Sequence, residues 1–144
     1  MPCVSAPVAQ NMAIIQIGVS QSAAWLQQLA QQGQPVQPAQ VVWFNALMDT
    51  GCSDTCVTQQ MAAQAGLPVV GIVQIATAAG PAQAYQFYGD LHFVLPNTGI
   101  VAVFPNRVIS QLLAGSPTHS SLLGMDVFTM GALAVNANAA QFCW

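Results

Sequence analysis

Short apolar runs separated by turn residues are the feature that most restricts the fold of this chain. Residues 12–19 form one such run, which is rich in β-branched side chains and lies between Asn11 and Ser20. Residues 41–48 form a second run that is mostly apolar. Runs of this length, bounded by turn residues, are typical of β-strands. The sequence therefore predicts a mainly β protein.

Clusters of turn residues predict two β-hairpins in the middle of the chain. Residues 71–76 and 83–88 are predicted strands around the turn cluster Thr77, Ala78, Ala79, Gly80 and Pro81. Residues 91–95 and 100–104 are predicted strands around Pro96, Asn97, Thr98 and Gly99. Two terminal strands are expected at residues 132–135 and 141–144, while residues 107–113 fit either a strand or a helix.

Two or three short helices are expected beside these strands. Ser20 can cap a helix that Gly33 and Pro35 would end, and Thr58 can cap a helix over residues 59–65. A third short helix is expected after Gly124. Together these elements predict one domain over residues 1–144, with a flexible N-terminal segment at residues 1–11 and a helix followed by a Gln/Pro-rich insertion at residues 20–40.

The scarcity of charge excludes several classes of function. The chain of 144 residues is 54% hydrophobic and only 3% charged, with one Arg and no Lys. A single cation cannot neutralise a run of phosphates, so nucleic acid is excluded as a partner. The apolar runs are far shorter than the roughly 20 residues of a membrane-spanning helix, and no secretory signal is visible. We expect a cytoplasmic protein that does not bind a membrane.

The same scarcity predicts tolerance of acid. Acid unfolds proteins largely by protonating carboxylates that are paired or hydrogen-bonded in the native state. This chain has only four carboxylate side chains, all of them Asp. We therefore expect the fold to persist at acidic pH.

The four cysteines do not form a recognisable framework. Cys52 and Cys56 lie four residues apart without a second pair, which argues against a zinc site and favours burial as small apolar side chains. Cys3 and Cys143 lie near opposite ends of the chain and can meet only if the termini meet. The redox state of all four stays open at this stage.

The most informative stretch of the sequence surrounds Asp49. An apolar strand leads directly into Asp49-Thr50-Gly51, which is followed by Ser- and Thr-rich turn residues. A predicted hairpin comes about 30 residues later, and Leu122-Leu123-Gly124 follows about 75 residues after the triplet. A strand that delivers one carboxylate into a tight turn is what one lobe of an aspartic protease requires.

With these motifs the sequence resembles the retropepsin-like aspartic proteases, in particular their bacterial single-domain members, over residues 14–142. The resemblance implies a closed, barrel-like β lobe in which Asp49 is the catalytic aspartate. Thr50 would lock two active-site loops together across a dimer, and Gly51 would keep the backbone close to a bound peptide. The hairpin tip at Thr77, Ala78, Ala79 and Gly80 would be the flap over the substrate, and Leu122, Leu123 and Gly124 would support the catalytic loop.

The sequence departs from the family pattern at two positions. Cys52 stands where the family usually has a smaller residue after the triplet. Met125 stands where many members have an Arg that braces the dimer near the active site. Arg107 is a candidate replacement for that brace.

One aspartate per chain implies a homodimer. Two carboxylates about 3 Å apart share one proton and so supply a base and an acid together. The chain carries a single Asp-Thr-Gly, so the second carboxylate must come from another copy. We expect an aspartic endopeptidase that acts on extended peptides or unfolded proteins with apolar side chains, at acidic pH, without a metal or organic cofactor. The alternative is a dimerisation or peptide-binding module on the same fold that has lost turnover.

The other polar residues have structural explanations at this stage. Asp54 and Asp126 are expected to satisfy backbone amides or cap a helix, and Asp90 is expected to lie in solvent at a turn. His92 and His119 are expected to be structural or exposed. A Ser-His-Asp triad would need a Gly-x-Ser-x-Gly elbow, which the sequence lacks.

Overall fold

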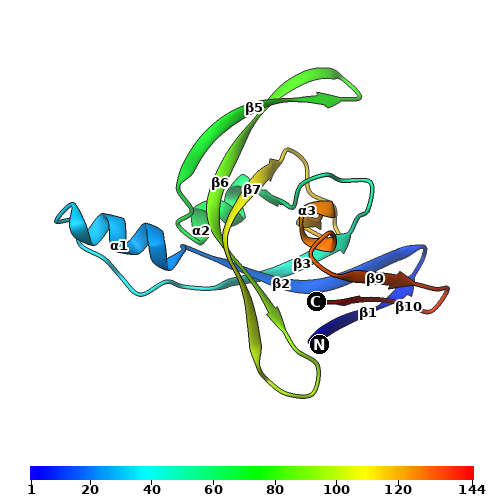
Figure 1. Cartoon of the computed structure of the whole chain (residues 1–144). Coiled ribbons are helices and arrows are strands. Elements are labelled where there is room, and N and C mark those ends of the chain that lie inside the picture. The colour runs from blue at the N-terminus through cyan, green and yellow to red at the C-terminus, as the bar shows by residue number, and fades with distance from the viewer.

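A closed barrel of six strands forms the body of the molecule (Figure 1). The computed structural model describes residues 1–144. Around the barrel the strands follow the order β2 (Met12–Ser20), β3 (Val42–Met48), β8 (Ser121–Leu123), β4 (Cys56–Thr58), β7 (Val101–Leu112) and β6 (Gly80–Val94). The pairing of β6 with β2 closes the ring, which leaves no free strand edge within it. The expectation of a mainly β, barrel-like fold is confirmed.

Two parallel pairings inside the barrel bring distant parts of the sequence together. Strand β3 runs parallel to β8 with Met48 opposite Leu123, and β4 runs parallel to β7. Because parallel strands end at the same edge of a sheet, the residues that follow β3 and β8 are neighbours. This pairing places Asp49 beside Gly124.

The two termini form a small antiparallel sheet against the barrel. Strand β10 (Ala139–Cys143) lies between β1 (Cys3–Ala9) and β9 (Ala132–Val135), and β1 continues into a pairing with β2. Cys3 lies opposite Cys143 and forms a disulfide with it. The prediction of a flexible segment at residues 1–11 is therefore wrong, because strand pairing and a covalent bond both hold this segment.

The helices are short and lie outside the barrel. Helix α1 (Ala23–Gln31) has no buried residue and projects from the barrel in Figure 1. Its N-cap is Ser22, whose hydroxyl accepts a hydrogen bond from the Trp25 amide, and not Ser20 as predicted. Ser20 instead ends β2 and is buried there. Residues 33–41 follow without regular secondary structure, as the predicted insertion suggests.

The other two helices agree with the sequence patterns. Helix α2 (Gln59–Gln64) begins after Thr58, whose hydroxyl accepts from the Met61 amide. Gly66 follows with a φ of +66°, the left-handed conformation that suits glycine after a helix. Helix α3 (Met125–Phe128) begins directly after Gly124. None of the three helices is long and apolar enough to cross a bilayer.

One long strand serves both predicted hairpins. Strand β6 pairs with β5 (Val69–Thr77) over its first half and with β7 along most of its length. The expected turn at Gly89 and Asp90 is instead an irregularity in the β6–β7 pairing. A Cβ at Gly89 would lie 2.5 Å from the carbonyl oxygen of Ser20, so glycine allows β6 to approach β2 closely. Asp90 is not simply solvated, since its Oδ1 accepts from the Asn106 amide at 2.8 Å.

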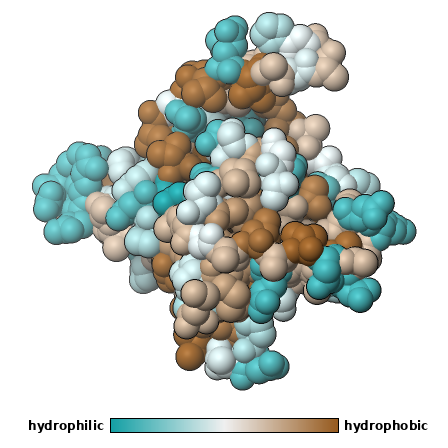
Figure 2. Space-filling model, turned by 45° about the vertical axis from the view of Figure 1, so that its right-hand side comes forward, coloured by the Kyte–Doolittle hydropathy of each residue, from teal (hydrophilic) through white to brown (hydrophobic).

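The β5–β6 hairpin extends beyond the barrel and arches over one end of it (Figure 1). Its outer side carries exposed apolar residues, including Val70 and Ile72, which is 60% exposed. Figure 2 shows hydrophobic residues over this projecting hairpin, whereas hydrophilic residues gather at the outer end of α1. The hairpin is thus held mainly by its own cross-strand pairing.

An aromatic cluster joins the terminal sheet to the barrel. Phe93, Phe104 and Trp144 contact one another, with the Phe104 ring centroid 5.1 Å from that of Phe93 and 5.0 Å from that of Trp144. Phe142 contacts Phe128 and stacks on Trp144. Phe93 and Phe142 are completely buried. Such aromatic pairs each add about 1 kcal/mol beyond their burial, so the terminal strands are part of the core.

Candidate active site

Asp49 lies in a tight turn directly after β3. Its amide donates to the carbonyl oxygen of Leu123 at 2.9 Å, which continues the β3–β8 pairing by one residue. The Cys52 amide donates to the Asp49 carbonyl oxygen at 3.2 Å and closes the turn. The Gly51 amide donates to the carboxylate Oδ1 at 2.8 Å, while Oδ2 has no partner within the chain. The carboxylate is therefore oriented at one oxygen and free at the other.

The next two residues of the triplet are exposed. Thr50 and Gly51 both lie at the surface, whereas Asp49 is half-buried. A Cβ at Gly51 would lie 3.1 Å from Oδ1 of Asp49. A side chain at Gly51 would therefore crowd the carboxylate that the glycine amide orients.

The N-terminus of α3 holds the rest of the turn from below. The Met125 amide donates to the Cys52 carbonyl oxygen at 2.8 Å, and the Asp126 amide donates to that of Ser53 at 3.0 Å. The first amides of a helix have no partner within the helix. Here these amides bind the backbone that follows Asp49, so the helix and the turn are built as one unit.

A buried network centred on Thr55 completes this support. The Thr55 amide and its hydroxyl both donate to Oδ1 of Asp126 at 2.8 Å. The Thr55 hydroxyl also accepts from the Gly124 amide at 3.1 Å. Thr55 is completely buried. The expectation that Asp126 satisfies backbone amides is confirmed, whereas the role of Thr55 was missed because a threonine in a Ser/Thr-rich turn carries no distinctive signal.

Gly124 is required by close contact between the two loops. A Cβ at this position would lie 2.6 Å from the carbonyl carbon of Asp54, a distance that real Cβ atoms do not reach. Leu123 is completely buried beneath the turn, and Leu122 is half-buried. The structure therefore places the predicted Leu122-Leu123-Gly124 segment directly beside the Asp49 turn.

A cleft of about 650 Å³ lies between this turn and the β5–β6 hairpin. One wall is formed by residues 51–54 and Cys56, and the other by residues 73–77 and Gln86. Residues 110–114 and Leu122 complete the lining. Asp49 and Thr50 lie outside the lining, so they face the surface beside the cleft rather than its interior.

Apolar and uncharged polar groups dominate the chemistry of the cleft. Val73, Ile75 and Leu112 supply apolar surface, and Gln74 and Ser110 supply uncharged polar groups. Asp54 is the single charged residue in the lining. A ligand of this cleft would therefore be held by apolar contacts and by hydrogen bonds more than by ion pairs.

The tip of the hairpin closes in a two-residue turn. Thr77 pairs with Gly80, and the Thr77 hydroxyl donates to the Gly80 carbonyl oxygen at 2.6 Å. Gly80 has a φ of +110°, a conformation that side chains disfavour. Thr77 lines the cleft, while Ala78, Ala79 and Gly80 form the tip beyond the lining.

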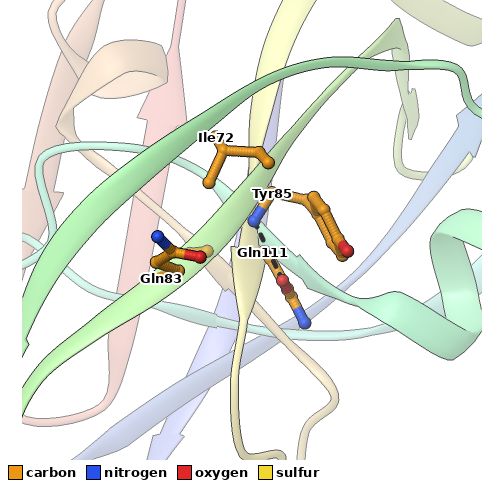
Figure 3. A pocket seen from close by; sticks show the side chains of 5 residues that line it. Ile72, Gln83, Tyr85 and Gln111 are labelled. Carbon is orange, nitrogen blue, oxygen red and sulfur yellow. Dashed lines mark hydrogen bonds between the residues drawn. The ribbon is translucent and has the colours of Figure 1, made fainter.

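Gln111 ties the base of the hairpin to the barrel and was not singled out by the sequence. Its side-chain Oε1 accepts from the Tyr85 amide at 2.9 Å, as Figure 3 shows. Ile72 and Gln83 lie around this contact, where a second cavity of about 260 Å³ opens. Because Gln111 also lines the main cleft, it lies between the two cavities.

Arg107 contacts the same support from the side of β7. Its Nη2 donates to the carbonyl oxygen of Asp126 at 3.1 Å. Arg107 therefore braces α3 within its own chain. Arg107 was the candidate replacement for the Arg that many family members have at the position of Met125. Its observed contact is with α3 of its own chain.

Two groups near or below the site have shifted pKa values. Burial and the neighbouring Cys52 raise the pKa of the Cys56 thiol, which keeps that thiol protonated. Burial lowers the pKa of His92, whose Nε2 lies 2.8 Å from the Ser20 hydroxyl. His92 is structural, as expected, and His119 contacts Thr118 in a surface loop.

No three His, Cys, Asp or Glu side chains gather as metal ligands would.

Comparison with known proteins agrees with this geometry. Residues 40–130, more than half of the chain, match the family described as "gag-polyprotein putative aspartyl protease". The fold is similar to that of a retropepsin-like aspartic protease from Rickettsia conorii, with a TM-score of 0.59 and 15% sequence identity. That match covers 97% of this chain and 87% of the other. No curated protein shows a significant match.

Proposed function

Because the chain belongs to the gag-polyprotein aspartyl protease family and has a retropepsin-like fold, we propose that it is an aspartic endopeptidase with Asp49 as its catalytic residue. The observation that carries the proposal is the arrangement of the Asp49 carboxylate. Its Oδ1 is fixed by the Gly51 amide at 2.8 Å, and its Oδ2 is free beside a cleft. A carboxylate with one oriented and one free oxygen can hold and activate a water molecule.

The exposure of the triplet supports a homodimer in which each chain supplies one Asp49. Thr50 and Gly51 are exposed, and Asp49 lies outside the lining of the cleft. A second copy related by a two-fold axis would cover these residues and bring a second carboxylate to the first. The Thr50 hydroxyls would then link the two turns.

The chemistry of such a pair follows from its shared proton. Two carboxylates about 3 Å apart cannot both ionise, so one stays protonated. The ionised carboxylate takes a proton from the water that attacks the peptide carbonyl carbon, and the protonated one donates to the carbonyl oxygen. The tetrahedral intermediate breaks its C–N bond as the first carboxylate gives the water proton to the amine nitrogen and the second regains its proton from a hydroxyl of the intermediate, which restores the shared proton. Because one carboxylate must hold a proton, we expect activity to fall towards neutral pH.

The cleft and its hairpin support the choice of an extended peptide as substrate. Residues 73–77 form one wall of the cleft, and the tip at residues 77–80 extends past it. We propose that this hairpin is a flap, whose backbone groups bind the peptide backbone as an added strand would. Apolar residues such as Val73 and Leu112 would hold apolar side chains of the substrate.

Cleavage of an unfolded protein tests the proposal. We expect wild-type protein to release fragments between about pH 3 and pH 6, and the Asp49→Asn variant to be at least about 1000-fold slower. The matched control is Asp90→Asn. It removes a carboxylate of β6 that does not line the cleft, and the asparagine oxygen can still accept from the Asn106 amide. Equal rates for wild type and Asp49→Asn would contradict the proposal. Absence of fragments from folded, dimeric wild type would favour a peptide-binding module.

A further inference from the structure

Two free thiols lie side by side directly after the catalytic triplet. The Sγ atoms of Cys52 and Cys56 are 3.9 Å apart. Both thiols donate to the same acceptor, the carbonyl oxygen of Asp54, at 2.9 and 3.2 Å. Neither takes part in the proposed mechanism, and both line the cleft of about 650 Å³.

The position of this pair differs from that of the other two cysteines. Cys3 and Cys143 are already joined in a disulfide between the terminal strands. Cys52 is half-buried, whereas Cys56, at the start of β4, is only 8% exposed. A small reagent in the cleft therefore reaches Cys52 first, with Cys56 directly behind it.

We propose that Cys52 and Cys56 form a redox-sensitive dithiol that a disulfide oxidant such as glutathione disulfide closes into a Cys52–Cys56 bond, and that closure switches off the site at Asp49. The regulatory half of this inference rests on the proposed protease function. The dithiol chemistry itself depends only on the geometry of the two thiols.

The reaction balances in two thiol–disulfide exchanges. The Cys52 thiolate attacks one sulfur of glutathione disulfide, which forms a mixed disulfide and releases one glutathione. The Cys56 thiol then gives its proton to the released glutathione thiolate as its sulfur attacks the Cys52 sulfur, which releases the second glutathione. Two thiols are oxidised and one glutathione disulfide is reduced. Burial keeps Cys56 protonated, so Cys52 is the first nucleophile and Cys56 the resolving one.

We expect closure to move the catalytic turn. The two sulfurs have to approach by about 2 Å to reach the length of a disulfide. Cys56 is held in β4 between Leu122 and Ser110, so the displacement falls on Cys52. The Cys52 amide binds the Asp49 carbonyl oxygen, and its own carbonyl oxygen accepts from Met125. Displacing Cys52 therefore also displaces Gly51, whose amide orients the carboxylate.

Oxidation also removes the two thiol hydrogens that the Asp54 carbonyl oxygen accepts. The Asp54 backbone cannot move towards Gly124, since the two already touch. The oxidised turn thus loses hydrogen bonds on one side and meets packed backbone on the other. A misplacement of about 1 Å at a catalytic group can cost about 100-fold in rate, and we expect a loss of this size.

The test treats the full chain with glutathione disulfide and maps the cysteines by mass spectrometry without reduction. We expect a Cys52–Cys56 linkage, intact Cys3–Cys143, and about 100-fold slower cleavage that reduced glutathione restores. The matched variants are Cys52→Ala and Cys56→Ala, each compared with itself before and after oxidation. Neither can form the linkage, and Cys52→Ala should cleave equally fast in both states.

Each possible result decides the inference. A glutathione adduct that persists on Cys52 without the linkage would overturn the dithiol, as would two thiols that stay free under oxidation. A linkage that leaves the cleavage rate unchanged would overturn the switch. Reduced wild type that cleaves nothing would overturn the proposed function and the switch together, while the mapping still decides whether the dithiol closes.

Discussion

The two walls of the cleft are built in opposite ways. The wall below consists of residues 51–54 and Cys56 together with the supporting helix α3, and it is held by side-chain and helix-end hydrogen bonds to its backbone, with Thr55 completely buried at its centre. The wall above, the β5–β6 hairpin, is held by cross-strand pairing and exposes side chains such as Ile72. We call these the fixed wall and the hairpin wall.

The difference matches what each wall would have to do in a protease. A catalytic carboxylate must stay within a fraction of an ångström of its working position, which requires support from several sides. A hairpin with few buried contacts opens at low free energy, which suits a segment that must admit a peptide. If this comparison is correct, substitutions in the fixed wall should cost more stability and more rate than substitutions in the hairpin wall.

The largest effect is expected for Asp126→Ala. The substitution leaves the buried Thr55 amide and hydroxyl without their acceptor. Because unpaired buried donors are costly, we expect the free energy of unfolding to fall by about 3 kcal/mol. Urea unfolding measures the loss, and cleavage should fall with it. The control is Asp90→Ala, which removes one exposed bond to Asn106 and should cost about 1 kcal/mol. Equal losses would contradict a special role for the fixed wall.

A smaller effect is expected for Gly124→Ala. The added methyl would lie 2.6 Å from the carbonyl carbon of Asp54, so the two loops must separate. We expect a loss of about 2 kcal/mol, together with a fall in kcat, because the Asp49 turn moves with Asp54. Unfolding curves and steady-state kinetics on a peptide measure the two quantities. A variant as stable and as active as wild type would show that the loops tolerate separation.

Gly80→Ala tests the hairpin wall with the same added methyl. Nothing lies within 4 Å of a Cβ at Gly80, so its cost comes only from the φ of +110°. We expect a loss of about 1 kcal/mol, most of it local to the tip, and a rise in KM larger than the fall in kcat. An effect on kcat as large as that of Gly124→Ala would remove the distinction between the two walls.

The smallest effect is the pH dependence of stability that His92, a residue outside both walls, should cause. Burial lowers the pKa of His92 in the folded state, so the unfolded chain binds its proton more readily. Stability should therefore be greatest above the unfolded pKa of about 6.5 and should decrease as the pH falls through the window below it. His92→Gln should remove this decrease while Asp49→Asn retains it, as free energies of unfolding at several pH values will show. A wild type with no decrease would contradict the assignment.

Much of this organisation could be predicted from the sequence because its signals are local. The strand that leads into Asp49, the cap at Thr58 and the turn at Thr77 each depend on neighbouring residues, and each lies where the patterns placed it. Ser20 failed as a cap because Ser22, two residues later, makes the same bond and leaves Ser20 to pair with His92.

The remaining features depend on contacts between distant segments. The strand at residues 3–9 buries Val4 and Ala6 and exposes Ser5 and Pro7, but it is short and contains a proline, so its pairing with β10 decides that it forms. The three-residue strands β4 and β8 are too short for a pattern, and their parallel pairings connect residues far apart in the chain. The bonds of Thr55 to Asp126 and of Gln111 to Tyr85 arise only after those strands are in place.

Mixing wild type with Asp49→Asn tests the central claim most directly. The two proteins are dissociated, mixed at constant total concentration, allowed to reassociate, and assayed for cleavage at acidic pH. If each active site takes one Asp49 from each of two chains, activity should fall as the square of the wild-type fraction, since mixed dimers hold a single carboxylate. A fall in direct proportion to the wild-type fraction would show that one chain acts alone and would contradict the account.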